Sequence, residues 1–172
     1  MGIMRTLLCI LLFSGFATSF TFAASKVRWP RDVVEWEKLK EAEETAKKEG
    51  KGLAFVFVPV EWPEDLNGSV GRSISATNDT IRALKSFCLI VKGNMQAVRA
   101  ASQGKEDAAP KALVAGMNAA GNTYPLVVIL DTEMKVVLGA TSGKNISTEG
   151  KKIFRAAKKK FRELEKAKEE EK

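Results

Sequence analysis

Leu53-Ala54-Phe55-Val56-Phe57-Val58 is the stretch that decides the fold. It is uncharged, too short to span a membrane, and too continuously apolar for a strand with one face in water. It therefore predicts a central strand that is buried on both faces. Pro59-Val60-Glu61-Trp62-Pro63-Glu64-Asp65-Leu66 follows directly. Because ligands collect beyond the carboxyl ends of such strands in open α/β sheets, we expect any chemistry to lie in this turn.

Two further segments have the same continuous apolar character, residues 87–91 and 126–130. Each predicts another buried strand. Residues 131–135 are turn-like, and the apolar residues 136–138 then predict a hairpin partner for the strand before them.

Apolar residues at helical spacing predict the helices between these strands. Asp32 with Glu35 forms a capping pattern for a first helix that ends at Gly50. Further helices are predicted over residues 79–85, 95–102 and 109–117. A last helix starts at Ser147 or Thr148 and keeps an apolar stripe to Leu164. The expected order of elements is α-β-α-β-α-β-β-α.

The 172 residues allow one domain, and an apolar share of 45% is ordinary for a globular core. Residues 1–24 combine one basic residue, an apolar run and small residues at the cleavage offsets. They predict a secretory signal peptide, with an uncleaved anchor as the alternative. Residues 25–31 are expected to form a linker, 32–164 the domain, and 165–172 a frayed charged tail. We therefore expect an exported protein, periplasmic or extracellular.

The chain has no histidine, and beyond the signal segment its single cysteine is Cys88. Without histidine, Ser-His-Asp catalysis, Cys-His catalysis and the usual zinc sites are excluded. Cys88 lies in the apolar segment 87–91, which predicts a small buried hydrophobic residue. A thiol-disulfide oxidoreductase that uses Cys88 alone is the alternative. We expect no intramolecular disulfide, no metal and no cofactor.

The order of elements resembles the thioredoxin-like superfamily over most of residues 36–164. Residues 36–51 resemble the first helix of exported members, and the segment from Tyr124-Pro125 to Asp131 resembles the family's cis-proline and the strand after it. Residues 135–137 and Gly143 resemble the next strand and the glycine before the last helix. The resemblance implies an α/β three-layer sandwich, with a mixed central sheet of about four strands flanked by helices. It also favours a bacterial source.

The family's redox motif, two cysteines separated by two residues, would fall within residues 61–66. One register places Pro63 and Leu66 at the cysteine positions, and the other places Trp62 and Asp65 there. Neither register supplies the accessible thiolate that disulfide exchange needs. We therefore expect a redox-inactive relative, and a binding protein rather than an enzyme.

Tyr124-Pro125, preceded by Thr123, is the best candidate for a functional surface. In the family, a cis-proline beside the redox turn exposes backbone groups that pair with an extended peptide, and a rigid turn into a strand is the alternative. The turn after the first strand either forms a rim that recognises a partner or covers the strand end. The residues expected to bind a peptide or protein partner are Thr123, Tyr124, Pro125, Glu61, Trp62, Pro63 and Asp65.

Two other patterns support weaker hypotheses. Glu61, Glu64 and Asp65 could serve in acid/base work or hold a metal, but nothing else marks a substrate. Asn67, Asn78 and Asn145 match the glycosylation pattern, which matters only for a eukaryotic source.

Basic residues gather on the last helix. A solvated face is the simplest interpretation, and a weak contact with an anionic membrane or envelope surface is the alternative. Nucleic acid is not expected, because export removes that partner and no aromatic residue interleaves on the exposed face. The basic residues are Lys151, Lys152, Arg155, Lys158, Lys159, Lys160 and Arg162.

Overall fold

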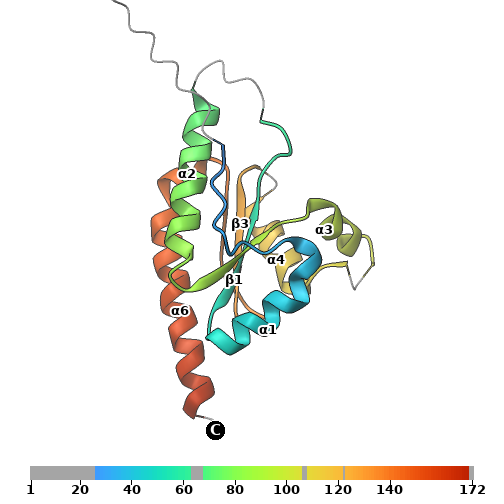
Figure 1. Ribbon diagram of the computed structural model, residues 1–172, viewed down its shortest axis with the longest axis vertical. Coiled ribbons are helices and arrows are strands. Elements are labelled where there is room, and N and C mark those ends of the chain that lie inside the picture. The colour runs from blue at the N-terminus through green and yellow to red at the C-terminus, as the bar shows by residue number, and fades with distance from the viewer. Residues whose placement is uncertain (1–25, 63–67, 106–107, 122, 171–172) are drawn as a thin grey trace, which may run out of the picture.

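The computed structural model describes residues 26–62, 68–105, 108–121 and 123–170 (Figure 1). Its strands are β1 (Gly52–Phe57), β2 (Cys88–Lys92), β3 (Leu126–Leu130) and β4 (Val137–Ser142). Its helices are a 3₁₀ turn η1 (Trp36–Lys38), α1 (Leu39–Glu49), α2 (Ser69–Leu84), α3 (Met95–Ser102), α4 (Lys111–Ala120), α5 (Lys144–Thr148) and α6 (Gly150–Glu170).

The four strands form one mixed sheet in the order β2-β1-β3-β4. β1 runs parallel to β2 and antiparallel to β3, and β4 runs antiparallel to β3. All residues of β1 are buried. The prediction that this apolar segment forms the central, doubly covered strand is therefore confirmed.

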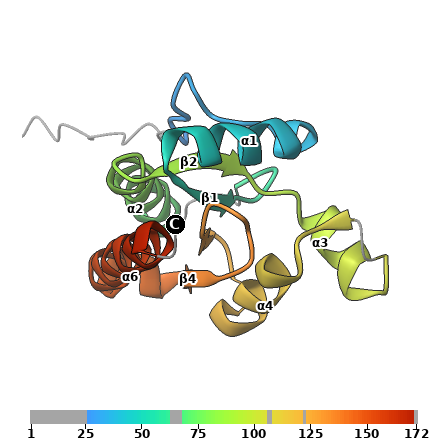
Figure 2. The same cartoon turned by 90° about the horizontal axis from the view of Figure 1, so that it is seen from below.

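Helices cover both faces of the sheet (Figure 2). Leu53, Phe55 and Phe57 of β1 pack in one core with residues of α1, α3 and α4. The alternate residues, Ala54 and Val56, pack in a second core with residues of α2, α5 and α6. The predicted fold class, an α/β three-layer sandwich with a mixed sheet of about four strands, is therefore confirmed.

The predicted helix cap at Asp32 is wrong. Asp32 lies in a turn, with its carboxylate 2.9 Å from Lys85 Nζ, and the hydrogen bond from Lys85 lowers the pKa of Asp32. Val34 bonds with the outer edge of β2: its N–H donates to Ile90 O at 2.9 Å, and its C=O accepts from Lys92 N at 2.9 Å. This pairing with a sheet edge keeps residues 33–35 extended. The helical segment therefore begins at Trp36.

α2 is longer than the predicted helix over residues 79–85. It begins at Ser69 and buries a regular stripe against the sheet and α6. Ser69, Gly71 and Ser73 resemble a loop by composition, and this hides the first half of the helix in the sequence. The stripe consists of Val70, Ile74, Thr77, Ile81 and Leu84.

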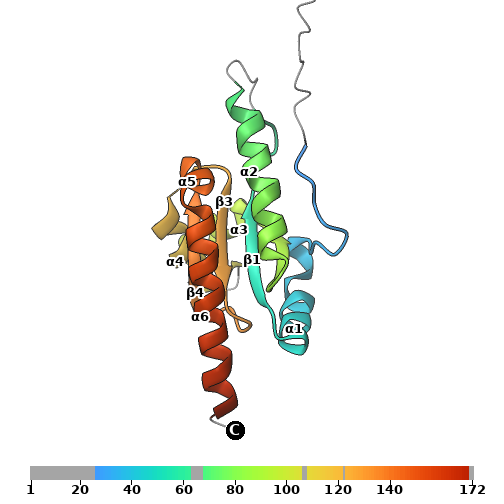
Figure 3. The same ribbon diagram turned by 90° about the vertical axis from the view of Figure 1, so that its left-hand side faces the viewer.

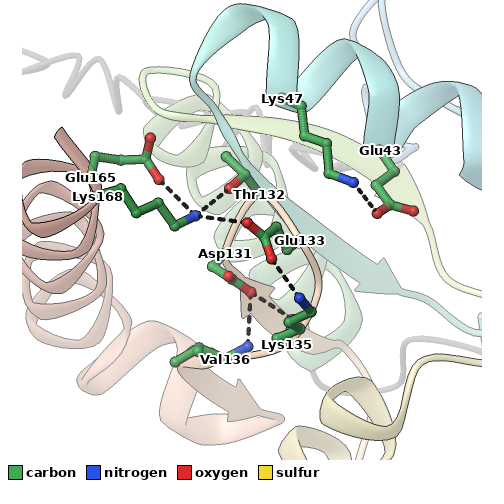
Figure 4. A network of polar contacts seen from close by, with 9 residues as sticks. All are labelled: Glu43, Lys47, Asp131, Thr132, Glu133, Lys135, Val136, Glu165 and Lys168. Carbon is green, nitrogen blue, oxygen red and sulfur yellow. Dashed lines mark hydrogen bonds and ion pairs between the residues drawn. The ribbon is translucent and has the colours of Figure 1, made fainter. Parts of the chain in front are cut away.

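α6 continues to Glu170, so the frayed tail predicted from residue 165 is wrong for residues 165–170. Lys168 Nζ donates to Thr132 Oγ1 at 3.1 Å and lies 3.5 Å from a Glu133 oxygen (Figure 4). These contacts join the last turns of α6 to the β3–β4 turn. The tertiary contact holds a segment that has little apolar surface of its own.

Candidate functional site

A groove opens where the chain leaves β1 and β2. Because the two strands are parallel, their carboxyl ends lie at the same edge of the sheet, with β1 ending at Phe57 and β2 at Lys92. The groove has a volume of about 470 Å³. We call it the Tyr124 groove, and it is lined by Glu35, Trp36, Glu37, Phe57, Val58, Pro59, Val60, Lys92, Gly93, Asn94, Met95, Gln96 and Tyr124.

Phe57 and Gly93 meet closely at the base of this groove. A Cβ atom on Gly93 would lie 2.3 Å from Phe57 Cδ1, which is closer than real side chains approach. The Gly93 N–H also donates to Val56 O at 2.9 Å. Glycine at this position therefore lets the exit of β2 pass directly against the aromatic ring.

An aromatic residue and an ion pair form one wall of the groove. The Trp36 ring packs edge-on against Phe55, with the two centroids 6.0 Å apart. Lys92 pairs with Glu35 and lies 5.4 Å from the centre of the Trp29 ring. This wall therefore combines the apolar surface of Trp36 with the ion pair between Lys92 and Glu35.

The opposite rim is the start of α3. Asn94 caps this helix, because its Oδ1 accepts hydrogen bonds from Gln96 N at 3.0 Å and Ala97 N at 3.1 Å. The cap fixes the first helical residue, Met95, beside the groove. A flexible thioether at a rim adapts to different apolar partners.

Tyr124 stands exposed beside the groove, with 37% of its surface accessible, whereas Pro125 is buried. The peptide bond between them is cis. Pro125 O accepts a hydrogen bond from Gly143 N at 2.8 Å. Within the described part of the chain, the backbone N–H and C=O groups of Thr123 and Tyr124 have no hydrogen-bond partner.

A second hollow lies beside Tyr124, between α3 and α4. It has a volume of about 180 Å³ and shares Tyr124 and Met95 with the larger groove. We call it the α3–α4 recess. Tyr124 therefore borders two concave surfaces, and the recess is lined by Met95, Val98, Arg99, Ser102, Met117, Asn118 and Tyr124.

The structure brings together only part of the predicted site. Tyr124 lines both concave surfaces, and Thr123 is exposed next to it. Glu61 is exposed and Trp62 is half-buried, but neither lines the groove. Pro63 and Asp65, together with Glu64, lie outside the described residues. Among the residues that the structure describes, no group of three His, Cys, Asp or Glu side chains could hold a metal ion.

Several groove residues were not predicted as site residues: Trp36, Phe57, Lys92 and Met95. Phe57 and Lys92 stand at the carboxyl ends of predicted strands, so the rule on ligand sites in α/β sheets could have found them. Trp36 and Met95 carry no comparable signal. Only the folded sheet places their helices beside the strand ends.

Cys88 lies far from the groove. It is the first residue of β2 and pairs with Gly52, the first residue of β1, so it is at the opposite end of the sheet from Phe57. At roughly 3.3 Å per residue the separation is about 16 Å. The side chain is buried, and desolvation raises the pKa of the Cys88 thiol. The predicted burial of Cys88 is confirmed.

Comparisons with known proteins add a distant structural likeness. No family model matches the chain, and no curated protein matches it. Among solved structures, it is similar to a disulphide isomerase from Xylella fastidiosa Temecula1, with 18% sequence identity and a TM-score of 0.38. The match covers 81% of this chain and 97% of the isomerase. The fold assignment stands on the sheet order and the two helical layers.

Proposed function

We propose that this is an exported, redox-inactive thioredoxin-like protein that binds an extended segment of a partner protein at the Tyr124 groove. One observation carries the proposal. The backbone groups of Thr123 and Tyr124, which have no partner among the described residues, lie beside a largely apolar groove at the carboxyl ends of β1 and β2. Such an edge supports strand addition, in which backbone hydrogen bonds hold the guest segment.

The two concave surfaces supply the side-chain contacts that strand addition also needs. Successive side chains of an extended peptide point to opposite sides. A peptide that runs past Tyr124 would direct alternate side chains into the Tyr124 groove and the α3–α4 recess. Phe57, Trp36 and Val58 favour an apolar side chain in the groove. Met95 and Met117 favour a second apolar side chain in the recess.

Solvent exposure around the groove also supports docking. Val60 is fully exposed at 102%, and Tyr124 is the other large hydrophobic side chain exposed in the described residues. Both line the same groove. Exposed apolar groups around a concavity are typical of protein-binding sites.

The Tyr124→Ala variant should bind peptide at least about tenfold more weakly than the wild type, since buried tyrosines are frequent interface anchors. The probe is the strongest binder selected from a display library of short unstructured peptides, and its affinity is measured by fluorescence anisotropy. Tyr124→Phe, which keeps the ring, should bind nearly as well as the wild type. Arg82→Ala, in α2 on the other face of the sheet, is the matched surface control.

Failure of the library to yield any binder would contradict the peptide-binding function. Equal affinity of the wild type and Tyr124→Ala would show that the peptide binds somewhere other than the Tyr124 groove. The thermal midpoint of each variant is measured alongside, because a substitution at this exposed position should affect folding little.

The burial of Cys88 supports redox inactivity. A thiol must ionise and be accessible to attack a disulfide. Desolvation disfavours the Cys88 thiolate, and the thiol lies at the opposite end of the sheet from the groove. We therefore expect no reduction of insulin by dithiothreitol beyond the uncatalysed rate, and slow labelling of Cys88 by a thiol reagent in the native protein. Turnover that disappears in Cys88→Ser would favour the oxidoreductase alternative.

A further inference from the structure

A row of basic side chains runs along the solvent face of α6. Lys151, Arg155, Arg162 and Lys166 recur at helical spacing, with Lys158 and Lys159 between them, so they share one side of the helix. Phe154, Ala157 and Phe161 occupy the opposite, buried side. From Lys151 to Lys166 the row extends about 22 Å, at 1.5 Å per residue. We call these six residues, Lys151, Arg155, Lys158, Lys159, Arg162 and Lys166, the α6 basic stripe.

The side chains of the α6 basic stripe lie close to one another. Five of them, together with Glu163, line one shallow hollow of about 340 Å³ on α6. Glu163 is the one acidic group in that lining, and it lies 3.7 Å from Lys159 Nζ with both side chains well exposed. An exposed pair of this kind neutralises little of the local field.

Most of the charge in the stripe has no counter-charge within the described residues. Lys158 donates to Ser86 Oγ at 3.2 Å and lies 5.8 Å from the Phe87 ring centre, and neither contact is anionic. The side chains of Lys151, Arg155, Arg162 and Lys166 have no hydrogen-bond or ion-pair partner among those residues. A rigid helix thus holds like charges together, which costs free energy unless an anionic surface meets them.

We propose that the α6 basic stripe docks the protein on a bilayer surface rich in anionic phospholipid headgroups. α6 lies beside α2 in one helical layer of the molecule (Figure 3), and every residue of the stripe except the partly buried Lys158 is exposed. A flat anionic surface can meet all positions of such a row at once. Each lysine or arginine that comes near the lipid surface adds attraction, and the attraction weakens with salt.

The composition of the stripe also defines how it binds. Its exposed face carries no large apolar side chain that could enter the acyl region, because Phe154 and Phe161 are buried. Docking is therefore electrostatic and superficial. The same lack of exposed aromatic rings on α6 disfavours single-stranded nucleic acid, which binds by stacking on such rings.

This docking surface is independent of the proposed peptide site. The Tyr124 groove is formed by η1, α3 and the carboxyl ends of the strands, whereas the stripe belongs to α6 on the second face. A protein that docks through α6 would keep the groove open to a partner. Loss of one activity should therefore leave the other intact.

The test uses vesicles of equal parts phosphatidylglycerol and phosphatidylcholine, with pure phosphatidylcholine vesicles as the neutral reference. The protein is purified after export and its co-sedimentation is measured across a salt series. The combined variant Lys151→Gln, Arg155→Gln and Arg162→Gln should lower the partition coefficient on anionic vesicles about a hundredfold at low salt. The matched control, Lys38→Gln, Lys40→Gln and Lys48→Gln, removes the same charge from exposed positions of η1 and α1 and should change it less than about threefold.

Three results would overturn the proposal. Equal losses in the two variants would show an effect of net charge rather than of the stripe. Equal binding of the wild type to neutral and anionic vesicles would exclude headgroup charge as the determinant. Release of the protein from anionic vesicles by a lower concentration of single-stranded DNA than of phosphatidylglycerol vesicles would assign the stripe to nucleic acid.

Discussion

Phe55→Ala is expected to lower the free energy of unfolding by about 3–5 kcal/mol, in the range found for large aromatic truncations in cores. Phe55 is completely buried, and its Cα pairs with Val91 on one side and Val128 on the other. Its ring also packs edge-on against Trp36. A sheet strand with neighbours on both sides cannot move into the space, so a cavity remains and adds to the lost burial.

Equilibrium denaturation in urea measures this loss, and Val60→Ala serves as the control. Val60 lies just beyond the same strand but is fully exposed, so its truncation should change stability by no more than about 0.5 kcal/mol. A loss below about 1 kcal/mol in Phe55→Ala would contradict the assignment of β1 as the centre of the sheet.

One strand and one short helix, β3 and α3, could be predicted well from local sequence, whereas α5 lies where the start of the last helix was expected. β3 has the predicted bounds, Leu126–Leu130, because five apolar residues stand between a proline and an aspartate. α3 likewise has the predicted bounds, Met95–Ser102, with Asn94 as its cap. In both segments the local signal and the tertiary environment favour the same structure, which makes prediction reliable.

Prediction failed where a contact distant in sequence decides the structure. A capping pattern at Asp32 starts a helix only if the next residues can adopt helical backbone angles. Val34 is instead paired with the edge of β2 and is therefore extended. The end of α6 was expected to fray because it lacks an apolar face, yet Lys168 anchors it to Thr132 and Glu133. Neither contact can be recognised from the residues that stand next to it in the sequence.

The candidate site could be predicted only in part for the same reason. Tyr124 is indicated by one short piece of the resemblance, the segment from Tyr124-Pro125 to Asp131, and the general rule on strand ends indicates the region of Val58 and Val60. Trp36, Lys92 and Met95 come from three separate segments. Lys92 ends β2 and Met95 begins α3 just after it. The pairing of Val34 with the outer edge of β2 brings Trp36 beside them, so this grouping depends on a contact distant in sequence.

Asp131→Ala is expected to lower the free energy of unfolding by about 2–4 kcal/mol, because each hydrogen bond to a charged group contributes roughly 1.5–3 kcal/mol. Asp131 is buried, and its Oδ1 accepts from Lys135 N at 2.7 Å and Val136 N at 2.8 Å (Figure 4). Alanine would leave two backbone donors of the β3–β4 turn without their acceptor. The same urea titration measures the loss.

Two variants separate the role of this carboxylate from that of the charges around it. Asp131→Asn keeps an acceptor oxygen and should lose only about half as much stability as Asp131→Ala. Lys135→Ala keeps the backbone donor but removes an exposed pair with Glu133, so it should change stability far less than Asp131→Ala does. Equal losses in Asp131→Asn and Asp131→Ala would show that the charge of Asp131, rather than its acceptor geometry, stabilises the turn.

The Asp131→Ala variant also tests whether the stability of the fold and the binding of peptide depend on different ends of the sheet. Asp131 follows Leu130, which pairs with Leu53 at the start of β1, whereas Leu126 pairs with Phe57 at the groove. The turn is thus at the opposite end of β3 from Tyr124. Folded Asp131→Ala protein should therefore bind the selected peptide with the affinity of the wild type, although it unfolds at a lower urea concentration. A loss of affinity in the folded variant would mean that the groove depends on the far end of the sheet.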